Sequence, residues 1–308
     1  MKTLIIYFSQ TGNTRKVAER IRDGVVTETG QCDLTNLADV DKSVLADYDL
    51  VGLGCPVFYL KAPFNMYEFI EGLPELRHQQ WFVFCTHNTN IGNTLPSMVE
   101  HLKKKSIIVI GYHHTYAEPI NIPFYPYPAL TTGHPDSIDL EEARAFGREI
   151  VARSQSIADG DISLIQEPEP VSQEWAREFQ KLDLKLLKKV APRLSINTDK
   201  CTRCHTCEDN CPVKGIDVEA DPPRIQNPCI YCYHCWGVCP TLAIEANWDA
   251  WAYFESKSFA EQRRELDKAS ARGEFRWLID PDSLNLDTPE PFFKHREREL
   301  KGVKPGDS

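Results

Sequence analysis

Eight of the eleven cysteines lie in one short segment and are regularly spaced. Four form C-x2-C-x2-C-x3-C followed by Pro212, and four more repeat that spacing and precede Pro240. Each cysteine of the second run lies 28 residues after its counterpart, which indicates an internal duplication with two equivalent sites. Without signs of export, clustered thiolates indicate metal ligands. They are Cys201, Cys204, Cys207, Cys211, Cys229, Cys232, Cys235 and Cys239.

Two kinds of metal site suit such thiolates, structural zinc and iron–sulfur clusters. Zinc ribbons use two C-x2-C pairs per ion and need neither a third cysteine at this spacing nor the Cys-Pro ending. Three cysteines can wrap one corner of a cubane, and in runs of this form the fourth ligates the other cluster. The predicted ligand sets are Cys201, Cys204, Cys207 and Cys239 for one 4Fe–4S cluster, and Cys229, Cys232, Cys235 and Cys211 for the other.

The region 194–247 resembles the bacterial-type ferredoxins that carry two 4Fe–4S clusters. The resemblance implies a small α+β domain that carries single electrons at low potential.

A polar turn follows the first predicted strand, Thr3–Phe8, and precedes a predicted helix. Hydroxyls and free N–H groups at a helix N-terminus can bind a phosphate, although such a turn can also be a simple helix cap. No Gly-Lys-Ser/Thr follows, so this is not a Walker loop. The turn resembles the phosphate loop of flavodoxins, which implies that FMN binds at Ser9, Thr11, Gly12, Asn13 and Thr14.

Two further loops follow predicted strands and resemble the flavin loops of the same family. The second offers an aromatic ring and backbone groups to the isoalloxazine, through Cys55, Pro56, Val57, Phe58 and Tyr59. The third departs from the usual pattern and contributes Thr86, His87, Asn88 and Gly92. His87 could hydrogen-bond the flavin or only solvent. Three loops at the carboxyl ends of three strands match the usual ligand position in open α/β sheets.

Strands and helices alternate over residues 1–158, which predicts a flavodoxin-like, doubly wound parallel sheet of the α/β class. A linker with one helix over 173–190 is expected at 159–193, then the cluster domain at 194–247, then a C-terminal tail at 248–308 with a helix starting near Ser258. A Pro- and aromatic-rich insertion occupies 113–138. Long loops of this kind are often functional covers.

The formal net charge is −10, which disfavours nucleic acid and favours a partner with a basic docking surface. The first apolar run is too short for a signal sequence, and a cytoplasmic location is expected. The primary hypothesis is an electron carrier that links two 4Fe–4S clusters, FMN and a redox partner protein. One alternative is an FMN-dependent reductase in which the insertion covers the flavin and supplies Tyr125, Tyr127 and two histidines as proton donors. Another is an electron-input subunit of a larger redox enzyme.

Overall fold

The computed structural model describes residues 1–119 and 122–300, without the side chains of residues 176 and 178–180. The chain divides into two compact units. Unit 1 comprises Met1–Ala117 and Gly133–Asp183, and unit 2 comprises Glu118–Thr132 and Leu184–Ser308. The chain therefore passes from one unit to the other three times.

Five parallel strands form the sheet of unit 1, in the order β2-β1-β3-β4-β5. This is the strand order of flavodoxin-like doubly wound sheets, so the predicted fold class is confirmed. The strands are β1 (Thr3–Tyr7), β2 (Asp33–Asn36), β3 (Leu50–Pro56), β4 (Gln80–His87) and β5 (Ile108–Tyr116).

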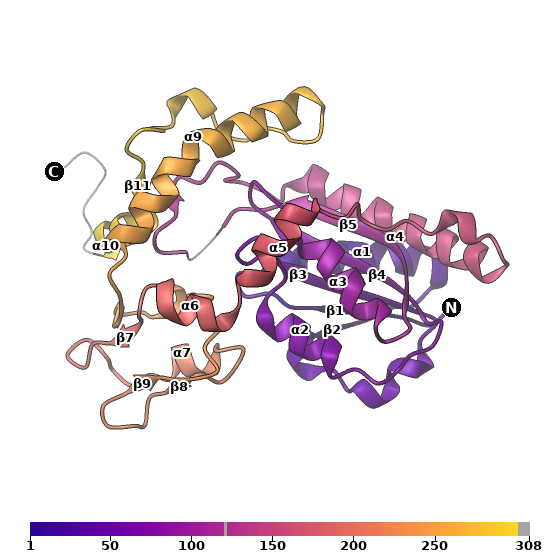
Figure 1. Ribbon diagram of the computed structural model, residues 1–308, viewed down its shortest axis with the longest axis horizontal. Coiled ribbons are helices and arrows are strands. Elements are labelled where there is room, and N and C mark those ends of the chain that lie inside the picture. The colour runs from indigo at the N-terminus through magenta and orange to yellow at the C-terminus, as the bar shows by residue number, and fades with distance from the viewer. Residues whose placement is uncertain (120–121, 301–308) are drawn as a thin grey trace. The chain divides into compact units, whose positions relative to one another are not determined.

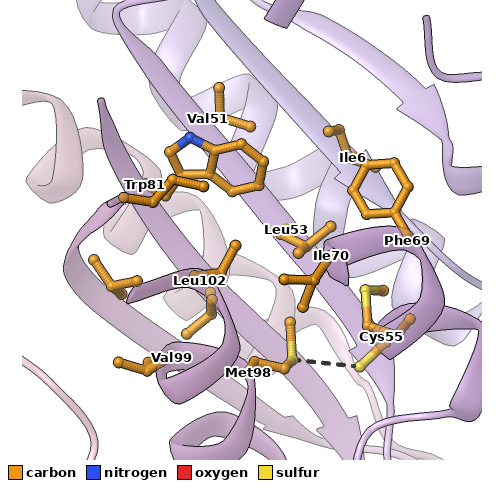
Figure 2. Close-up of a cluster of buried hydrophobic side chains, with 14 of the residues drawn as sticks. Ile6, Val51, Leu53, Cys55, Phe69, Ile70, Trp81, Met98, Val99 and Leu102 are labelled. Carbon is orange, nitrogen blue, oxygen red and sulfur yellow. Dashed lines mark hydrogen bonds between the residues drawn. The ribbon is translucent and has the colours of Figure 1, made fainter. Parts of the chain in front are cut away.

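Helices cover both faces of this sheet (Figure 1). On one side lie α1 (Asn13–Thr29) and α4 (Ser137–Ala158), and on the other α2 (Phe64–Glu71) and α3 (Thr94–Lys103). Because strand side chains alternate, Phe82 and Phe84 pack towards α1 and α4, whereas Trp81 and Cys85 pack towards α2 and α3. Figure 2 shows the second of these clusters, in which the Cys55 thiol contacts the Met98 sulfur at 3.7 Å.

Two glycines let α1 and α4 approach closely. A Cβ on Gly24 would lie 2.1 Å from the Arg144 carbonyl oxygen, and one on Gly147 would lie 2.1 Å from that of Ile21. Short 3-10 turns, η1 (Leu37–Asp39), η2 (Lys42–Asp47) and η3 (Ile162–Leu164), complete the connections of this unit.

The single helix predicted over 173–190 is wrong, because the structure has two helices there. They are α5 (Gln173–Lys181) and α6 (Leu184–Val190). At the break, the Lys61 ammonium donates to the Leu182 carbonyl at 3.0 Å. In a continuous helix the Leu182 carbonyl would accept a hydrogen bond from a backbone N–H of the same helix. Here the Lys61 side chain, from a distant part of the sequence, takes the place of that N–H.

Unit 2 is a small α+β domain built from two-residue strands and short helices. Antiparallel pairs join β7 (Ser195–Ile196) to β10 (Ile244–Glu245), β8 (Ile216–Asp217) to β9 (Arg224–Ile225), and β6 (Pro126–Tyr127) to β11 (Glu290–Pro291). Its other helices are α7 (Thr206–Asp209), α8 (His234–Val238), α9 (Asp249–Ala271), α10 (Phe292–Leu300) and the 3-10 turn η4 (Pro281–Ser283).

The predicted start of the tail helix at Ser258 is also wrong. Helix α9 begins at Asp249, and the Ser258 hydroxyl donates to the Glu255 carbonyl inside the helix at 2.9 Å instead of capping an end. Helix α9 begins earlier than predicted because aromatic rings at its N-terminal end pack against other rings of unit 2. Buried Trp248 lies 5.7 Å from the ring of Tyr233 in an edge-on contact.

Most of the predicted insertion belongs to unit 2, and we call residues 118–132 the strap. Its positions 120 and 121 lie outside the described residues, as do positions 301–308 of the predicted tail. The Phe124 ring is buried and lies 5.2 Å from that of Tyr233 and 5.3 Å from that of Trp251. The Tyr125 hydroxyl donates to the Gln262 side chain at 2.5 Å. The strap is therefore part of the core of unit 2.

Candidate functional site

A small hollow lies in unit 2 among cysteines of both runs. Cys201, Cys204 and Cys207 of the first run line it together with Cys239, the last cysteine of the second run. These are the four residues predicted to hold one cluster. Burial, followed by the nearby Cys239 thiolate, raises the pKa of Cys207 to about 11. Cys239 thus lies next to the first run although it belongs to the second.

The duplicated sequence folds into a duplicated backbone around the cysteines. Left-handed conformations at Arg203, His205 and Lys214, with φ of 52°, 59° and 54°, recur 28 residues later at Tyr231, Tyr233 and Leu242, with φ of 55°, 57° and 51°. Non-glycine residues adopt this region at an energetic cost, and such strain is concentrated at binding sites. Its repetition at matched positions indicates that both runs are shaped for the same group.

Backbone N–H groups point at the fourth cysteine of each run. Gly215 donates to the Cys211 sulfur at 3.1 Å, and Ala243 donates to the Cys239 sulfur at 3.2 Å. Hydrogen bonds to sulfur stabilise the thiolate form that binds iron and help to set the potential of a cluster. The matched pair shows that the two sites share this feature as well.

Cys211 lies beside the second run. Burial raises the pKa of Cys229, and the Cys211 thiolate adds to this rise. Burial also raises the pKa of Cys235, with further contributions from Cys232 and Cys229 and a smaller one from Cys207 of the other group. The second predicted set of thiols therefore lies together, and the two sets are neighbours.

Both sites have features that fit an inorganic cluster. Among the described residues, no three His, Cys, Asp or Glu side chains converge on a position for a single metal ion. A cubane does not need such convergence, because each thiolate binds a different iron. Next to Cys235, the buried Nδ1 of His234 has no hydrogen-bond partner in the described chain. A cluster sulfur would give this donor an acceptor.

Solvent reaches the first set of thiols mainly at Cys204, which is exposed, whereas Cys207 and Cys239 are buried. Hydrogen bonds with Thr206 lower the pKa of Cys204. In the second set Cys235 is buried and the other three cysteines are partly exposed. Cys204 is thus the most solvent-exposed of the eight cysteines, and we call its side of the site the Cys204 edge.

The predicted phosphate loop lies between β1 and α1. Gly12 has a φ of 95° and precedes the helix without a side-chain cap, so the first N–H groups of α1 are left for another acceptor. The half-buried hydroxyls of Ser9 and Thr11 have no protein hydrogen bond in the described chain. Buried Thr14 shares a 2.7 Å hydrogen bond with Thr86 of β4. These donors at a helix N-terminus fit a phosphate monoester.

The second predicted flavin loop is a tight hairpin. Phe58 and Lys61 exchange two backbone hydrogen bonds of 2.9 and 3.0 Å, and Tyr59 and Leu60 between them have φ of 52° and 60°. Two consecutive left-handed residues without glycine are a strained turn of the kind found at binding sites. The Val57 N–H donates to the Thr86 carbonyl at 2.8 Å, which joins this loop to β4.

The third loop packs directly on that hairpin. The Asn93 N–H donates to the Leu60 carbonyl at 2.8 Å. Gly92 has a φ of 57°, and a Cβ there would lie 2.1 Å from the same carbonyl oxygen. Sequence reasoning selected Gly92 but missed Leu60, whose role depends on a contact across more than thirty positions.

Two of the predicted flavin residues direct their side chains into the protein. The Cys55 thiol lies in the apolar cluster of Figure 2, and burial raises its pKa. His87 Nδ1 donates to the Asn88 carbonyl at 3.0 Å, which leaves Nε2 to accept from Nδ1 of His114 at 3.0 Å. Burial, and His114 next, lower the pKa of His87 to about 3. The ring is neutral and holds the loop through protein partners.

Comparison with known families assigns two segments of the chain. A flavodoxin domain model matches residues 4–107, and a 4Fe–4S dicluster domain model matches residues 193–240. The chain is a flavodoxin–ferredoxin fusion. The flavodoxin domain of the fusion implies FMN, the dicluster domain implies iron–sulfur clusters, and together they make it an electron-transfer iron–sulfur flavoprotein.

Two relatives agree by sequence with this assignment of the fusion. A flavodoxin of Clostridium saccharobutylicum is 28% identical over 164 residues, which cover 51% of the fusion and 99% of that protein. An uncharacterized ferredoxin of Methanocaldococcus jannaschii is 38% identical over 48 residues, 15% of the fusion and 77% of the ferredoxin. A solved archaeal flavodoxin aligns with a TM-score of 0.40 at 19% identity, over 50% of the fusion and 99% of its own chain. Within the described residues, no helix has the length and hydrophobicity needed to cross a bilayer.

Proposed function

We propose that the fusion carries electrons between two 4Fe–4S clusters, one FMN and a redox partner protein. The observation that carries the proposal is the hollow lined jointly by Cys201, Cys204, Cys207 and Cys239, which supports crossed ligation by the two runs. Clusters pass single electrons, whereas FMN accepts one or two.

This chain's own residues would hold the flavin and the clusters in place. Ser9, Thr11 and the N-terminus of α1 would bind the phosphate, and the loops that meet at Leu60 and Gly92 would hold the isoalloxazine. Neighbouring thiol sets in unit 2 support electron transfer from one cluster to the other. The exposed Cys204 edge is the candidate exit to the partner. Given the net charge of −10, a partner with a basic docking surface fits best.

The reductase alternative has less support from the two tyrosines suggested as its proton donors. The Tyr125 hydroxyl donates to Gln262, and the Tyr127 ring stacks on His295 at 3.8 Å, both within unit 2. The Tyr125 hydroxyl is thus engaged in a hydrogen bond of a buried residue, whereas Tyr127 remains partly exposed. The carrier function is therefore favoured.

Anaerobic purification followed by iron, sulfide and flavin analysis tests the cofactor content. We expect about eight iron, about eight sulfide and one FMN per chain, as two cubanes and one flavin require. A colourless protein with zinc as its metal would refute the proposal.

Replacing Cys211 by serine tests the crossed ligation. We expect Cys211→Ser to disturb the same electron paramagnetic resonance (EPR) signal as Cys232→Ser and to spare the signal that Cys204→Ser disturbs. Cys32→Ser, outside both runs, is the matched control and should leave both signals and the iron content unchanged. If Cys211→Ser instead reproduces the spectrum of Cys204→Ser, each run holds its own cluster.

A further inference from the structure

A single arginine of the C-terminal helix reaches the backbone of the second cysteine run. Arg296 of α10 donates from one guanidinium nitrogen to the Trp236 carbonyl at 2.8 Å and from the other to the Cys239 carbonyl at 3.0 Å. The guanidinium carbon also lies 4.8 Å from the centre of the Trp236 ring. These three contacts fix the cation beside Cys239, which lines the hollow in unit 2.

The charge of Arg296 is only partly screened. Its side chain is partly buried, and burial lowers the pKa of Arg296, whereas Cys239 and Glu299 favour its charged form. Arginine remains protonated in proteins even so. Its two hydrogen-bond acceptors are neutral carbonyls, and Glu299, the carboxylate that affects it, has a side chain that is 63% exposed. A positive charge thus persists beside Cys239.

The strap holds the helix that carries this arginine. The backbone N–H groups of Phe292 and Phe293, at the start of α10, donate to the carbonyls of Tyr125 and Pro123 at 2.8 Å each. Tyr127 of the strap stacks on His295, next to Arg296. The start of α10 is therefore fixed by non-helical partners, which limits the positions that its side chains can take.

We propose that Arg296 is a positioning residue that raises the reduction potential of the cluster bound by Cys201, Cys204, Cys207 and Cys239, and so makes it the preferred electron acceptor of the two. The inference rests on the proposed function, because it requires two clusters and crossed ligation. An electron that enters a cluster adds one negative charge, and a fixed cation nearby lowers the free energy of that reduced state. Arg296 bonds the backbone at Cys239 directly, whereas Lys188, the cation that acts on Cys229 of the second set, makes no hydrogen bond to that cysteine among the described residues.

The test is a dithionite titration of the anaerobic holoprotein, with each cluster followed by EPR and assigned with Cys204→Ser and Cys232→Ser. We expect Arg296→Gln to shift the electron distribution between the clusters about tenfold away from the first one, which equals about 59 mV for a one-electron couple. Arg296→Lys keeps the charge and should restore most of the potential. Arg298→Gln is the matched control: it removes the same charge two positions later, where the guanidinium pairs with Glu290, and should leave both potentials unchanged.

A second variant guards against loss of folding in Arg296→Gln. Glu299→Lys reverses an exposed charge near Arg296 and should raise the potential of the first cluster, opposite in sign to Arg296→Gln. If both clusters are present and these variants move neither potential, or move both equally, Arg296 only fastens the tail and the inference is overturned. A wild-type protein without clusters would instead refute the proposed function.

Discussion

Replacing Gly92 by alanine tests whether the contact between the second and third loops holds the flavin site. The new Cβ would lie 2.1 Å from the Leu60 carbonyl oxygen, 2.6 Å from its carbon and 2.7 Å from the Leu60 Cα. All three are backbone atoms, so no change of side-chain rotamer relieves the clash. The hairpin tip would have to move away from Gly92.

The size of the effect follows from two costs. Holding alanine at a φ of 57° costs about 1 kcal/mol relative to glycine. Moving the hairpin tip breaks the 2.8 Å hydrogen bond from Asn93 to Leu60, a loss of about 1–2 kcal/mol. Both costs fall on the folded protein whether or not FMN is bound, so the free energy of unfolding should fall by about 2–3 kcal/mol. Binding FMN against the loops in their present positions must also restore the clash, and we expect the affinity for FMN to fall by about tenfold or more.

The assay is a titration of the deflavinated protein with FMN, followed by quenching of flavin fluorescence. Gly30→Ala is the matched control, because Gly30 ends α1 with a φ of 79° and an added Cβ meets no atom within 4 Å. It should lower stability by about 1 kcal/mol and leave the affinity for FMN within about twofold. If folded Gly92→Ala binds FMN as tightly as the wild type, the reasoning about these loops is refuted.

Three further predictions concern the strap, the buried histidines and Cys55. Phe124→Ala should destabilise unit 2 by about 3–5 kcal/mol and speed the loss of visible absorbance in air. Its control is Tyr253→Ala, at a side chain that is 66% exposed, which should cost less than about 1 kcal/mol. Equal effects of the two variants would show that the strap is not part of the core. Burial holds the pKa of His87 at about 3 and that of His113 at about 4. The unfolded chain therefore binds more protons below about pH 6.5, and in urea unfolding the stability should fall with decreasing pH by up to about 1.4 kcal/mol per unit for each histidine. His113→Gln should reduce the dependence of stability on pH. An unchanged dependence would contradict the lowered pKa of His113. Cys55→Ala should cost about 1 kcal/mol of stability without changing FMN affinity, and a large loss of affinity would instead place the thiol at the flavin.

The predictions from sequence were accurate where the relevant information is local. Continuous apolar runs separated by helical patterns predicted the sheet of unit 1, and the structure confirms a five-stranded parallel sheet. Helix ends were less accurate, because the Lys61 contact breaks the helix at Leu182 and aromatic packing extends α9 back to Asp249. Both errors arise from contacts between distant parts of the chain.

The predicted flavin residues lie on three loops of one unit, but their side chains differ in what they do. Sequence left open whether His87 faces flavin or solvent, and the fold gives both ring nitrogens protein partners. A motif selects positions in a loop. It does not show which side chains point into the core, because that depends on neighbours such as Met98 and His114.

By itself the sequence determined the kinds of cofactor, because cysteine spacing and a strand–turn–helix signal are encoded within a few residues of each other. Only the tertiary structure decided that the strap belongs with the cysteine-rich unit and that Arg296 reaches Cys239. The separation is 57 positions for Arg296 and Cys239 and 137 positions for Tyr125 and Gln262. No local pattern encodes such pairings, because they form only when the whole core packs.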